Sequence, residues 1–545
     1  MKFKETDLFR VYQSIDLVSG IHICIAFMHD YVVTNTHTHY TKHSYIQGNV
    51  MDGSELALNM PSLMKLKNAI YSTEYRNFIE KIAGLEAGSL TDEVDCAANC
   101  HTRGCHLLCH DDVIGTRKVS YIIYLTDAEP EWKDTDGGRL ELYDAIAEDD
   151  RFVPGALPVK TVLPVFNSMA YFVVEPGVSF HSVQEVFCDR PRLSIQGWYH
   201  TKEAPSQIEN ATLQRLKSTG NGENTEGAFH PMISETASTA AAATTKTEEE
   251  NETESEPTIS GNDSKFLGEY INKAYLTEES LKEIRMRFED ESSVQLRHFL
   301  NDEWSSKVKA AFTRQDKRDV LGNNSPSLDY HVGIDKKWKA VGPAHKQRFL
   351  QYEEGSGSAD LSTKVSPDNV IDVGEYLDHL KQNLFQSAEF GRWIGWLSSL
   401  GFPLGYRGRI RRFRPGLDYT VAHYGILTTN SVLDTTLCFC GGDGNQCSFD
   451  EETDELIGTD DDAMWESGDV GGFECYIAAD DDDQGAEAEY DEDDDTQLLS
   501  VSASFNTLSL VYRDPGTMKF VKYVGSGAPS SRWDIALEYD VKSDE

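Results

Sequence analysis

Short apolar runs separated by turn residues dominate the second part of the N-terminal half, which is the pattern of β-strands. The runs are rich in β-branched and aromatic residues and read, between residues 118 and 200, KVSYIIYLT, GGRLELY, KTVLPVF, SMAYFVV and PRLSIQGWYH. Before them, Leu63, Leu66 and Ile70 follow a helical spacing, and Pro61 suits the first turn of that helix. This order predicts a mainly β fold with supporting helices, an α+β sandwich or barrel.

The C-terminal half repeats this order of helices followed by strands. One helical stretch places Leu281, Ile284 and Phe288 on one face, a second spans residues 377–384, and strand-like runs fill residues 411–539. A single hydrophobic core stops growing at roughly 250–300 residues, and the chain has 545. We therefore expect two domains of similar construction.

Three segments have compositions that do not support a packed core. Residues 203–264 are rich in Thr, Ser, Glu and Ala, which predicts a disordered linker. The run DDDDQGAEAEYDEDDD at 480–495 predicts an acidic loop, either solvated or docking a basic protein. Residues 19–51 show no clear period, so we expect a disordered insertion there. The predicted domains are then residues 1–202 and residues 265–545.

The charge balance restricts the partners of this protein. The chain has 50 Lys and Arg against 91 Asp and Glu, a formal net charge of −41, which disfavours binding of nucleic-acid phosphates and favours a basic partner. The apolar run at 21–28 is far shorter than the roughly 20 residues of a membrane span. Ten cysteines in this length do not form a disulfide framework and favour a reducing compartment.

The residues most typical of chemistry lie within these predicted strands. His110 and Asp112 are two positions apart in LLCHDD, so on a strand both would point to the same face. His181 follows in VEPGVSFHSV, and Arg192 comes 11 positions later. Two imidazoles and one carboxylate form the facial triad that leaves open positions on iron(II). The planar fork of Arg192 suits the far carboxylate of a 2-oxo acid, and the hydroxyl of Tyr124 can donate to the same group.

This combination of H-x-D, a distal histidine and a later arginine resembles the iron(II)/2-oxoglutarate dioxygenases. The fuller series CHDD, YIIYL, GGRLELY, FHSVQEV and RLSIQGWYH is most similar to their prolyl hydroxylase branch, in particular to the eukaryotic ribosomal prolyl 3-hydroxylases. The resemblance covers residues 1–18, 54–202 and 265–545. It implies two tandem double-stranded β-helix (jelly-roll) domains, a catalytic first one and a degenerate, non-catalytic second one.

The resemblance also implies roles for individual residues. His110, Asp112 and His181 would ligate Fe(II), and Tyr124 and Arg192 would hold the co-substrate 2-oxoglutarate, with O2 as second co-substrate and ascorbate as reductant. The implied substrate is a proline of a basic small-subunit ribosomal protein, with consequences for translation termination or fidelity. The implied location is the cytoplasm and the nucleus, without a membrane and without direct binding of nucleic acid.

An internal comparison supports a second domain that has lost its metal. SMAYFVVEPGVSFHSV parallels NTLSLVYRDPGTMKFVKYV when the two Pro-Gly pairs are matched. This alignment places Phe520 opposite His181. Upstream, VAHYG matches LCHDD, so that His423 lies opposite His110 and Gly425 replaces the acid. We therefore expect the second β-helix to hold no iron and to serve stability or substrate docking.

Some motifs allow more than one interpretation. The four cysteines between residues 96 and 109 invite a zinc site, but their irregular spacing favours free thiols. The basic run GYRGRIRRFRPG at 405–416 fits an exposed strand better than a nuclear signal, and we expect Asp111 to face solvent. Two rival functions stay open: a dioxygenase acting on another protein or on RNA, and an oxygen-responsive interaction protein whose second domain binds a transcriptional or translational regulator.

Overall fold

The computed structural model covers most of the two predicted domains. The residues that it describes are 9–13, 46–49, 60–148, 151–217, 227–232, 259–322, 326–355, 371–441, 448–449, 456–457, 460–479 and 497–541. The predicted acidic loop at 480–495 and residues 19–45 of the predicted insertion lie outside the described residues. Within the described ranges, no helix combines the length and the apolar character that crossing a membrane requires.

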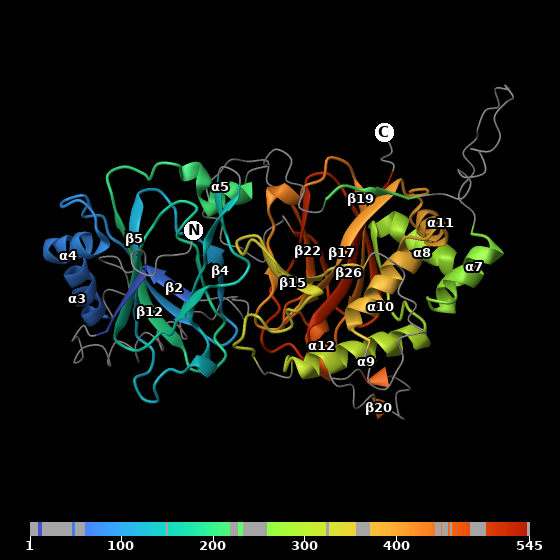
Figure 1. The fold of residues 1–545 in the computed structure, drawn as a ribbon, viewed down its shortest axis with the longest axis horizontal. Coiled ribbons are helices and arrows are strands. Elements are labelled where there is room, and N and C mark those ends of the chain that lie inside the picture. Colours follow the sequence, from blue (N-terminus) through green and yellow to red (C-terminus); the bar gives the residue numbers. More distant parts are fainter. Residues whose placement is uncertain are drawn as a thin grey trace, which may run out of the picture. The chain divides into compact units, whose positions relative to one another are not determined.

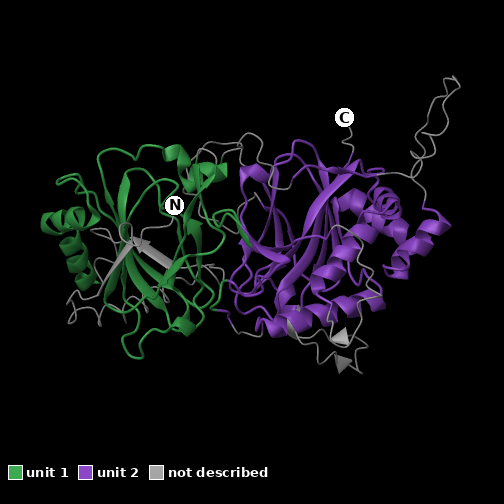
Figure 2. Cartoon of the chain, viewed as in Figure 1, with its two compact units in different colours: residues 1–218, 328–330, 342–348 green, residues 219–327, 331–341, 349–545 purple. Residues whose placement is uncertain are grey.

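The chain divides into two compact units, which Figure 2 shows in different colours. Unit 1 contains residues 1–218 together with the short segments 328–330 and 342–348. Unit 2 contains residues 219–327, 331–341 and 349–545. Unit 1 is thus wider than the predicted first domain, because two short pieces from beyond the predicted linker belong to it.

Two antiparallel sheets form unit 1, the arrangement expected of a double-stranded β-helix. The larger sheet has the order β1-β10-β5-β12-β3-β2, and the smaller one has the order β4-β11-β6-β9. The strands are β1 (Phe9–Gln13), β2 (Ile46–Asn49), β3 (Asp95–His101), β4 (Leu107–His110), β5 (Arg117–Tyr124), β6 (Leu140–Leu142), β9 (Lys160–Val162), β10 (Ser168–Val173), β11 (His181–Val183) and β12 (Arg192–His200). A separate hairpin consists of β7 (Ala145–Glu148) and β8 (Arg151–Pro154).

Helices α3 (Pro61–Ile70) and α4 (Thr73–Ala83) lie beside the larger sheet of unit 1 (Figure 1). The buried residues Leu63, Leu66 and Ile70 pack in one core with strand residues such as Tyr121, which confirms the predicted apolar helix face. Pro61 stands in the first turn, as predicted. The shorter elements of unit 1 are η1 (Asp134–Asp136), η2 (Ile208–Asn210) and α5 (Thr212–Lys217).

Unit 2 also contains one large and one small antiparallel sheet. The main path of the large sheet is β14-β24-β19-β26-β17-β16-β15, and the small sheet has the order β23-β22-β25. The strands are β13 (His230–Pro231), β14 (Ser293–Leu296), β15 (Trp338–Val341), β16 (Gln347–Tyr352), β17 (Gly405–Phe413), β18 (Tyr419–Thr420), β19 (Val432–Phe439), β20 (Ser448–Phe449), β21 (Leu456–Ile457), β22 (Glu474–Ala478), β23 (Gln497–Val501), β24 (Thr507–Arg513), β25 (Thr517–Val521) and β26 (Arg532–Asp540).

Helices pack on the large sheet of unit 2 through a core that includes Trp304, Phe312, Leu377 and Trp393 (Figure 1). The helices described in unit 2, not all of which reach this core, are α7 (Gly261–Leu267), η3 (Lys273–Leu276), α8 (Glu278–Glu291), α9 (Asp302–Arg318), α10 (Val373–Leu380), the π-helical turn η5 (Lys381–Phe385), α11 (Ala388–Ser398), η6 (Tyr424–Ile426) and α12 (Asp460–Glu466). The predicted helical stretches at 281–288 and 377–384 are thus present.

The strand order of unit 2 repeats that of unit 1. The order β10-β5-β12-β3-β2 in unit 1 has the counterpart β24-β19-β26-β17-β16 in unit 2, and the five strands follow one another along the chain in the same sequence. The small sheets agree as well, since β11 pairs with β6 and β25 pairs with β22. Gly177 and Gly516 of the matched Pro-Gly pairs both have a positive φ, 69° and 87°. This correspondence supports the expected second β-helix.

Part of the predicted linker is ordered, which corrects the expectation for residues 203–264. Within that range, η2 and α5 form, and β13 pairs with β17. The backbone N–H of Thr212 donates to the carboxylate of Asp111 (3.0 Å), and Arg215 donates to the carbonyl of Phe152 (2.6 Å). These anchors lie far away in the chain, so composition alone does not reveal them. In the same way β2, which pairs with β3, lies inside the predicted insertion 19–51.

Most of the basic run at 405–416 forms the strand β17, and four of its five arginines, Arg407, Arg411, Arg412 and Arg414, are buried rather than exposed. Arg412 is fully buried between Asp316 (2.8 Å) and Asp319 (2.6 Å), and Arg414 is fully buried against Asp418 (2.8 Å). Buried ion pairs of this kind keep the arginines inside the protein. The run therefore does not present an accessible nuclear signal in the folded protein.

Candidate active site

His110 and His181 come together because their strands are neighbours. Strands β4 and β11 pair antiparallel, and His181 lies directly opposite His110 in their register. The two imidazole rings have centroids 4.3 Å apart. The side chain of His110 is 28% exposed and that of His181 only 4%, so the pair opens to solvent on the His110 side.

Asp112 completes the group from a loop rather than from a strand. Strand β4 ends at His110, and Asp112 follows with a left-handed backbone, φ 62°. Its Oδ1 lies 3.3 Å from Nε2 of His110, and its Oδ2 lies 3.4 Å from Nε2 of His181. Among the described residues, this is the one group of three candidate metal ligands whose ligand atoms all lie within 4.8 Å of one another. The structure thus brings together the three predicted ligands, although the expected strand geometry at Asp112 is wrong.

Backbone carbonyls set the tautomer of both histidines. Nδ1–H of His110 donates to the carbonyl of Leu108 (2.7 Å), and Nδ1–H of His181 donates to the carbonyl of Ser179 (2.8 Å). A carbonyl only accepts, so the proton resides on Nδ1 and the lone pair on Nε2 points toward Asp112. Such a hydrogen bond is the usual support of a metal-binding imidazole. Both histidines therefore offer the nitrogen that a metal ion needs.

The electrostatics of the triad suit a cation. Burial raises the pKa of Asp112, but His181 and His110 outweigh burial and hold this pKa well below its usual range. Burial lowers the pKa of His110, while the carboxylate of Asp112 raises it, with a net upward shift. A carboxylate that stays ionised inside the protein, with two imidazole nitrogens beside it, is a donor set that Fe(II) accepts.

Arg192 and Tyr124 lie side by side at the ends of two strands in the larger sheet. Arg192 is the first residue of β12, and Tyr124 is the last residue of β5. The guanidinium carbon of Arg192 is 5.2 Å from the ring centre of Tyr124, and its Nε donates to the carbonyl of Gly138 (2.7 Å). Burial lowers the pKa of Arg192, and Tyr124 counteracts this shift. The arginine is thus fixed through its Nε–H, and its terminal nitrogens point away from the carbonyl of Gly138.

Two further residues, Asn99 and Ser194, lie beside Tyr124 in the same sheet and were not among the predicted site residues. The strand registers place Asn99 and Tyr124 on either side of Ser194. Asn99 and Ser194 are fully buried. Among the described residues, their side-chain polar atoms have no hydrogen-bond partner, and neither do the Tyr124 hydroxyl and one terminal nitrogen of Arg192. The strand period gives a usable signal, because Ser194 is two positions after Arg192 and shares its face.

These buried groups without partners fit a small dicarboxylate. Native proteins rarely leave buried polar atoms unsatisfied, so several of them together indicate space for a polar ligand. A guanidinium can bind one carboxylate through two nitrogens, and hydroxyl and amide groups can donate to the other oxygens. Asn99, Tyr124, Arg192 and Ser194 are therefore the residues that would hold 2-oxoglutarate, and His110, Asp112 and His181 those that would hold Fe(II).

Comparison with known proteins identifies the family. The family model of the 2OG-Fe(II) oxygenase superfamily matches residues 96–200, and the family model described as oxoglutarate and iron-dependent oxygenase degradation C-term matches residues 262–545. The chain is 37% identical over 541 residues to prolyl 3,4-dihydroxylase OGFOD1 of Ostreococcus tauri, which covers 98% of this chain and 89% of that protein. The chain belongs to the OGFOD1 family. It is 28% identical to the prolyl 3-hydroxylase OGFOD1 of Xenopus laevis, covering 88% and 78%.

Membership of the OGFOD1 family confirms two predictions made from the sequence. The first is the resemblance itself, and the second is the class of enzyme, a dioxygenase that depends on 2-oxoglutarate and Fe(II). The match at residues 96–200 contains the triad, Tyr124 and Arg192. The predicted roles of the individual residues rest on the geometry described above.

In this OGFOD1-family chain, a buried polar network supports strand β11 on the face opposite to His181. Ser182, the neighbour of His181, donates to Glu141, and Tyr330 donates to the other oxygen of Glu141 (2.6 Å). Arg348 donates to the hydroxyl of Tyr143 (3.1 Å), which lies 3.2 Å from Glu141. Tyr330 and Arg348 come from the two short segments of unit 1 that follow the predicted linker in the chain. Residues 328–330 and 342–348 of unit 1 therefore contribute to the support of a candidate metal ligand.

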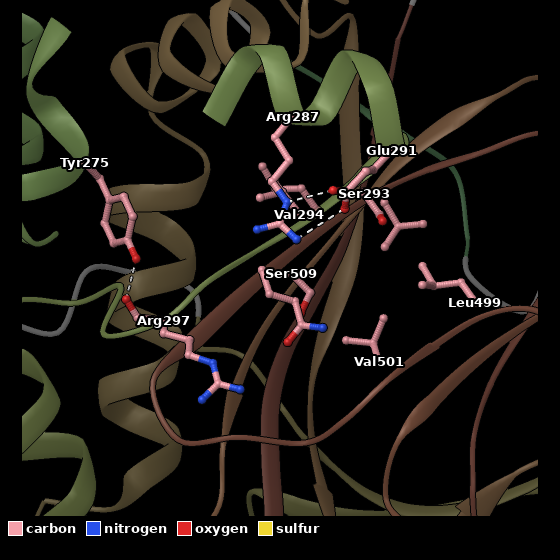
Figure 3. A pocket seen from close by; sticks show the side chains of 12 residues that line it. Tyr275, Arg287, Glu291, Ser293, Val294, Arg297, Leu499, Val501 and Ser509 are labelled. Carbon is pink, nitrogen blue, oxygen red and sulfur yellow. Dashed lines mark hydrogen bonds and ion pairs between the residues drawn. The ribbon is translucent and has the colours of Figure 1, made fainter. Parts of the chain in front are cut away.

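A groove of about 520 Å³ occurs in unit 2 of the OGFOD1-family chain (Figure 3). It lies along the edge strand β14 and is lined by residues of β23 and β24 as well. Its charged side chains are neutralised within the protein, since Arg287 pairs with Glu291 (3.1 Å) and Arg297 with Glu466 (2.8 Å). None of the predicted site residues lines this groove.

Proposed function

We propose that this protein is a prolyl hydroxylase that modifies a proline of another protein. The observation that carries the proposal is that unit 1 contains two groups of residues. One is the triad of His110, Asp112 and His181, and the other is a cluster of buried polar groups that have no hydrogen-bond partner among the described residues. Family membership supports it, because the relatives described above are named prolyl 3,4-dihydroxylase and prolyl 3-hydroxylase. A protein substrate follows from the same names.

The residues of the chain divide the work of such a reaction. Fe(II), 2-oxoglutarate and O2, when bound, supply the oxidising power, with ascorbate as reductant and with succinate, CO2 and hydroxylated substrate as products. His110 and His181 present Nε2 to the metal, and Asp112 balances its charge. Arg192 and Tyr124 bind the far carboxylate of 2-oxoglutarate. The more exposed His110 marks the side of the triad that the proline approaches.

We propose a basic small-subunit ribosomal protein as the substrate, with consequences for translation termination or fidelity. The formal net charge of −41 supports this choice, because ribosomal proteins are basic and long-range attraction accelerates association of opposite charges. We also propose that the enzyme works in the cytoplasm and the nucleus. Fractionation of cells that express a tagged chain tests this location.

Mass spectrometry of hydroxylated peptides tests the reaction and the substrate together. Proline-containing peptides from small-subunit ribosomal proteins are incubated with the purified chain, Fe(II), ascorbate and 2-oxoglutarate in air, with His110→Ala as the control. We expect one peptide to gain the mass of one or two oxygen atoms on proline, only when 2-oxoglutarate is present and not with the variant. A gain with His110→Ala, or none in any peptide, contradicts the proposal.

An interaction function of the second unit is the rival worth testing. It is favoured by the fact that residues 262–545 match a family model of their own, while the described part of unit 2 contains no group of three metal ligands. Asp112→Ala separates the two functions in cells. An enzyme loses its cellular effect with this variant, whereas an interaction protein keeps it.

A further inference from the structure

Asp111, the residue before the candidate ligand Asp112, does not face solvent as expected but is buried, with only 2% of its surface exposed. Its Oδ2 accepts the backbone N–H of Gly177 (3.1 Å) and that of Thr212 (3.0 Å), and its Oδ1 accepts that of Val113 (3.4 Å). Its carbonyl accepts the hydroxyl of Ser179 (2.8 Å). One residue therefore connects three segments that are far apart in the chain.

The first of these segments contains Asp112 itself. A non-glycine residue in the left-handed region costs roughly 1–2 kcal/mol, so the φ of 62° at Asp112 has to be held by its surroundings. The hydrogen bonds of Asp111 fix the residue that precedes Asp112. The N–H of Val113, which donates to the carboxylate of Asp111, fixes the residue that follows it. This backbone turns the Asp112 carboxylate toward both imidazoles. Its conformation is thus fixed by Asp111.

The second segment carries His181. The turn at 175–179 approaches Asp111 through the N–H of Gly177 and the hydroxyl of Ser179, and the carbonyl of Ser179 accepts Nδ1–H of His181 (2.8 Å). Asp111 is therefore two hydrogen bonds away from the ring of His181. The same carboxylate also anchors α5 through Thr212.

We propose that Asp111 is a positioning residue that sets the geometry of two metal ligands at once, Asp112 through the backbone and His181 through the turn that contains Gly177 and Ser179. The inference rests on the metal site of the proposed function. It adds to that function a residue that does not itself touch the metal. Partners of metal ligands typically change metal affinity about 10- to 100-fold when they are replaced.

The inference is tested by measuring metal affinity in the absence of substrate. Mn²⁺ is the probe, and the free ion is measured by electron paramagnetic resonance. Asp111→Asn keeps one acceptor oxygen and the size of the side chain. The matched control is Glu80→Gln, because Glu80 is also a buried carboxylate of unit 1 and accepts two backbone N–H groups, those of Gly88 (2.8 Å) and Leu90 (2.9 Å). Both variants should lower the melting temperature, and only Asp111→Asn should weaken Mn²⁺ binding, by about 10- to 100-fold.

A second variant keeps the test decisive if Asp111→Asn does not fold. Ser179→Ala removes the hydroxyl that contacts the carbonyl of Asp111 (2.8 Å) and, within the turn, the backbone of Glu175 (3.1 Å). It should weaken Mn²⁺ binding in the same direction by a smaller factor. Unchanged Mn²⁺ affinity in these variants, or an equal loss in Glu80→Gln, overturns the inference. A wild-type chain that binds Mn²⁺ but hydroxylates no proline contradicts the proposed function instead, and the affinity comparison still decides the role of Asp111.

Discussion

Arg192 shows how a buried charge can be prepared for a ligand. Its Nε is already bound to the carbonyl of Gly138, while one terminal nitrogen is buried without a partner among the described residues. An uncompensated buried guanidinium is unfavourable, so a carboxylate that reaches it is bound strongly. The planar fork matters here, because a lysine presents a single rotating ammonium group.

Replacement of Arg192 by lysine should therefore weaken the binding of 2-oxoglutarate more than it lowers kcat. We expect Arg192→Lys to raise KM for 2-oxoglutarate about 10- to 100-fold, since one charge-assisted hydrogen bond is lost, with a smaller change in kcat. Formation of succinate at varied 2-oxoglutarate concentration measures both constants.

The control for this prediction is Arg190→Lys. Arg190 is two positions away and pairs with Asp136 (2.6 Å) and Asp127 (3.2 Å) at the half-exposed surface. Arg190→Lys should leave KM for 2-oxoglutarate unchanged. An equal rise of KM in both variants would show that loss of any arginine near the start of β12 disturbs the pocket.

At the scale of single residues, the sequence predicts the candidate site residues but not the groups that support them. His110, Asp112, His181, Tyr124 and Arg192 are visible because their residue types and spacing are characteristic. Asp111 and Asn99 are not, because an acid beside a histidine or an amide in a strand has many ordinary roles. Their importance follows from burial and from partners such as Gly177 and Thr212, which only the folded chain brings close.

At the scale of elements, the turn before β6 determines where Arg192 can lie. Gly137 and Gly138 both have a positive φ, 75° and 67°. A Cβ on Gly138 would lie 2.6 Å from Cδ of Arg192, which is closer than side-chain atoms approach. The carbonyl of Gly138 is also the acceptor for Nε of Arg192. The turn and the arginine are therefore one structural unit.

Gly138→Ala should consequently affect both stability and co-substrate binding. The left-handed φ costs roughly 1–2 kcal/mol for alanine, and the contact displaces Arg192, so KM for 2-oxoglutarate should rise about tenfold or more. Gly84→Ala is the matched control, because Gly84 has φ 69° and no atom within 4 Å of its Cβ position. Urea unfolding should show a similar loss in both variants. Only Gly138→Ala should change KM, and an unchanged KM there contradicts the coupling.

Elements with strong local signals agree with the sequence, and elements held by distant partners do not. The runs KVSYIIYLT and RLSIQGWYH form the central strands β5 and β12, which are almost entirely buried, because β-branched and aromatic residues pack well in a sheet. Helix α5 lies in a segment with linker composition and forms where Asp111 and Phe152 bind it. Tertiary contacts override local composition in such cases.

At the scale of the whole molecule, the two units differ in what fills corresponding positions. In the strand registers, Arg532 and Asp534 of β26 occupy the places that Arg192 and Ser194 occupy in β12. The two terminal nitrogens of Arg532 pair with carboxylates of its own unit, those of Asp534 and Glu474 (3.3 Å). The chain itself thus supplies the acids at the position where unit 1 has polar groups without partners.

This replacement is compatible with the expectation that unit 2 holds no iron and serves stability or substrate docking. Glu474 is buried beside three cations, Arg532 (3.3 Å), Arg411 (3.3 Å) and Lys519 (3.8 Å). Burial raises the pKa of Glu474, but Lys519, Arg532 and Arg411 outweigh burial and lower this pKa to about 2. Its ordinary value in an unfolded chain is near 4.5. Since the folded pKa is the lower one, the ionised carboxylate stabilises the folded state above pH 4.5, and this contribution is lost as the pH falls toward 2.

Glu474→Gln should therefore destabilise the protein at neutral pH and much less in acid. Removal of one partner from a buried ion cluster costs about 3–5 kcal/mol, because the cations stay behind uncompensated. The difference in unfolding free energy from the wild type should shrink as the pH is lowered from 7 to 3, measured by urea unfolding with circular dichroism. The control is Glu303→Gln on α9, because Glu303 is exposed and pairs only with Lys307 (2.6 Å), so no measurable change is expected there. A pH-independent difference for Glu474→Gln would mean that packing, and not the charge of Glu474, carries its contribution.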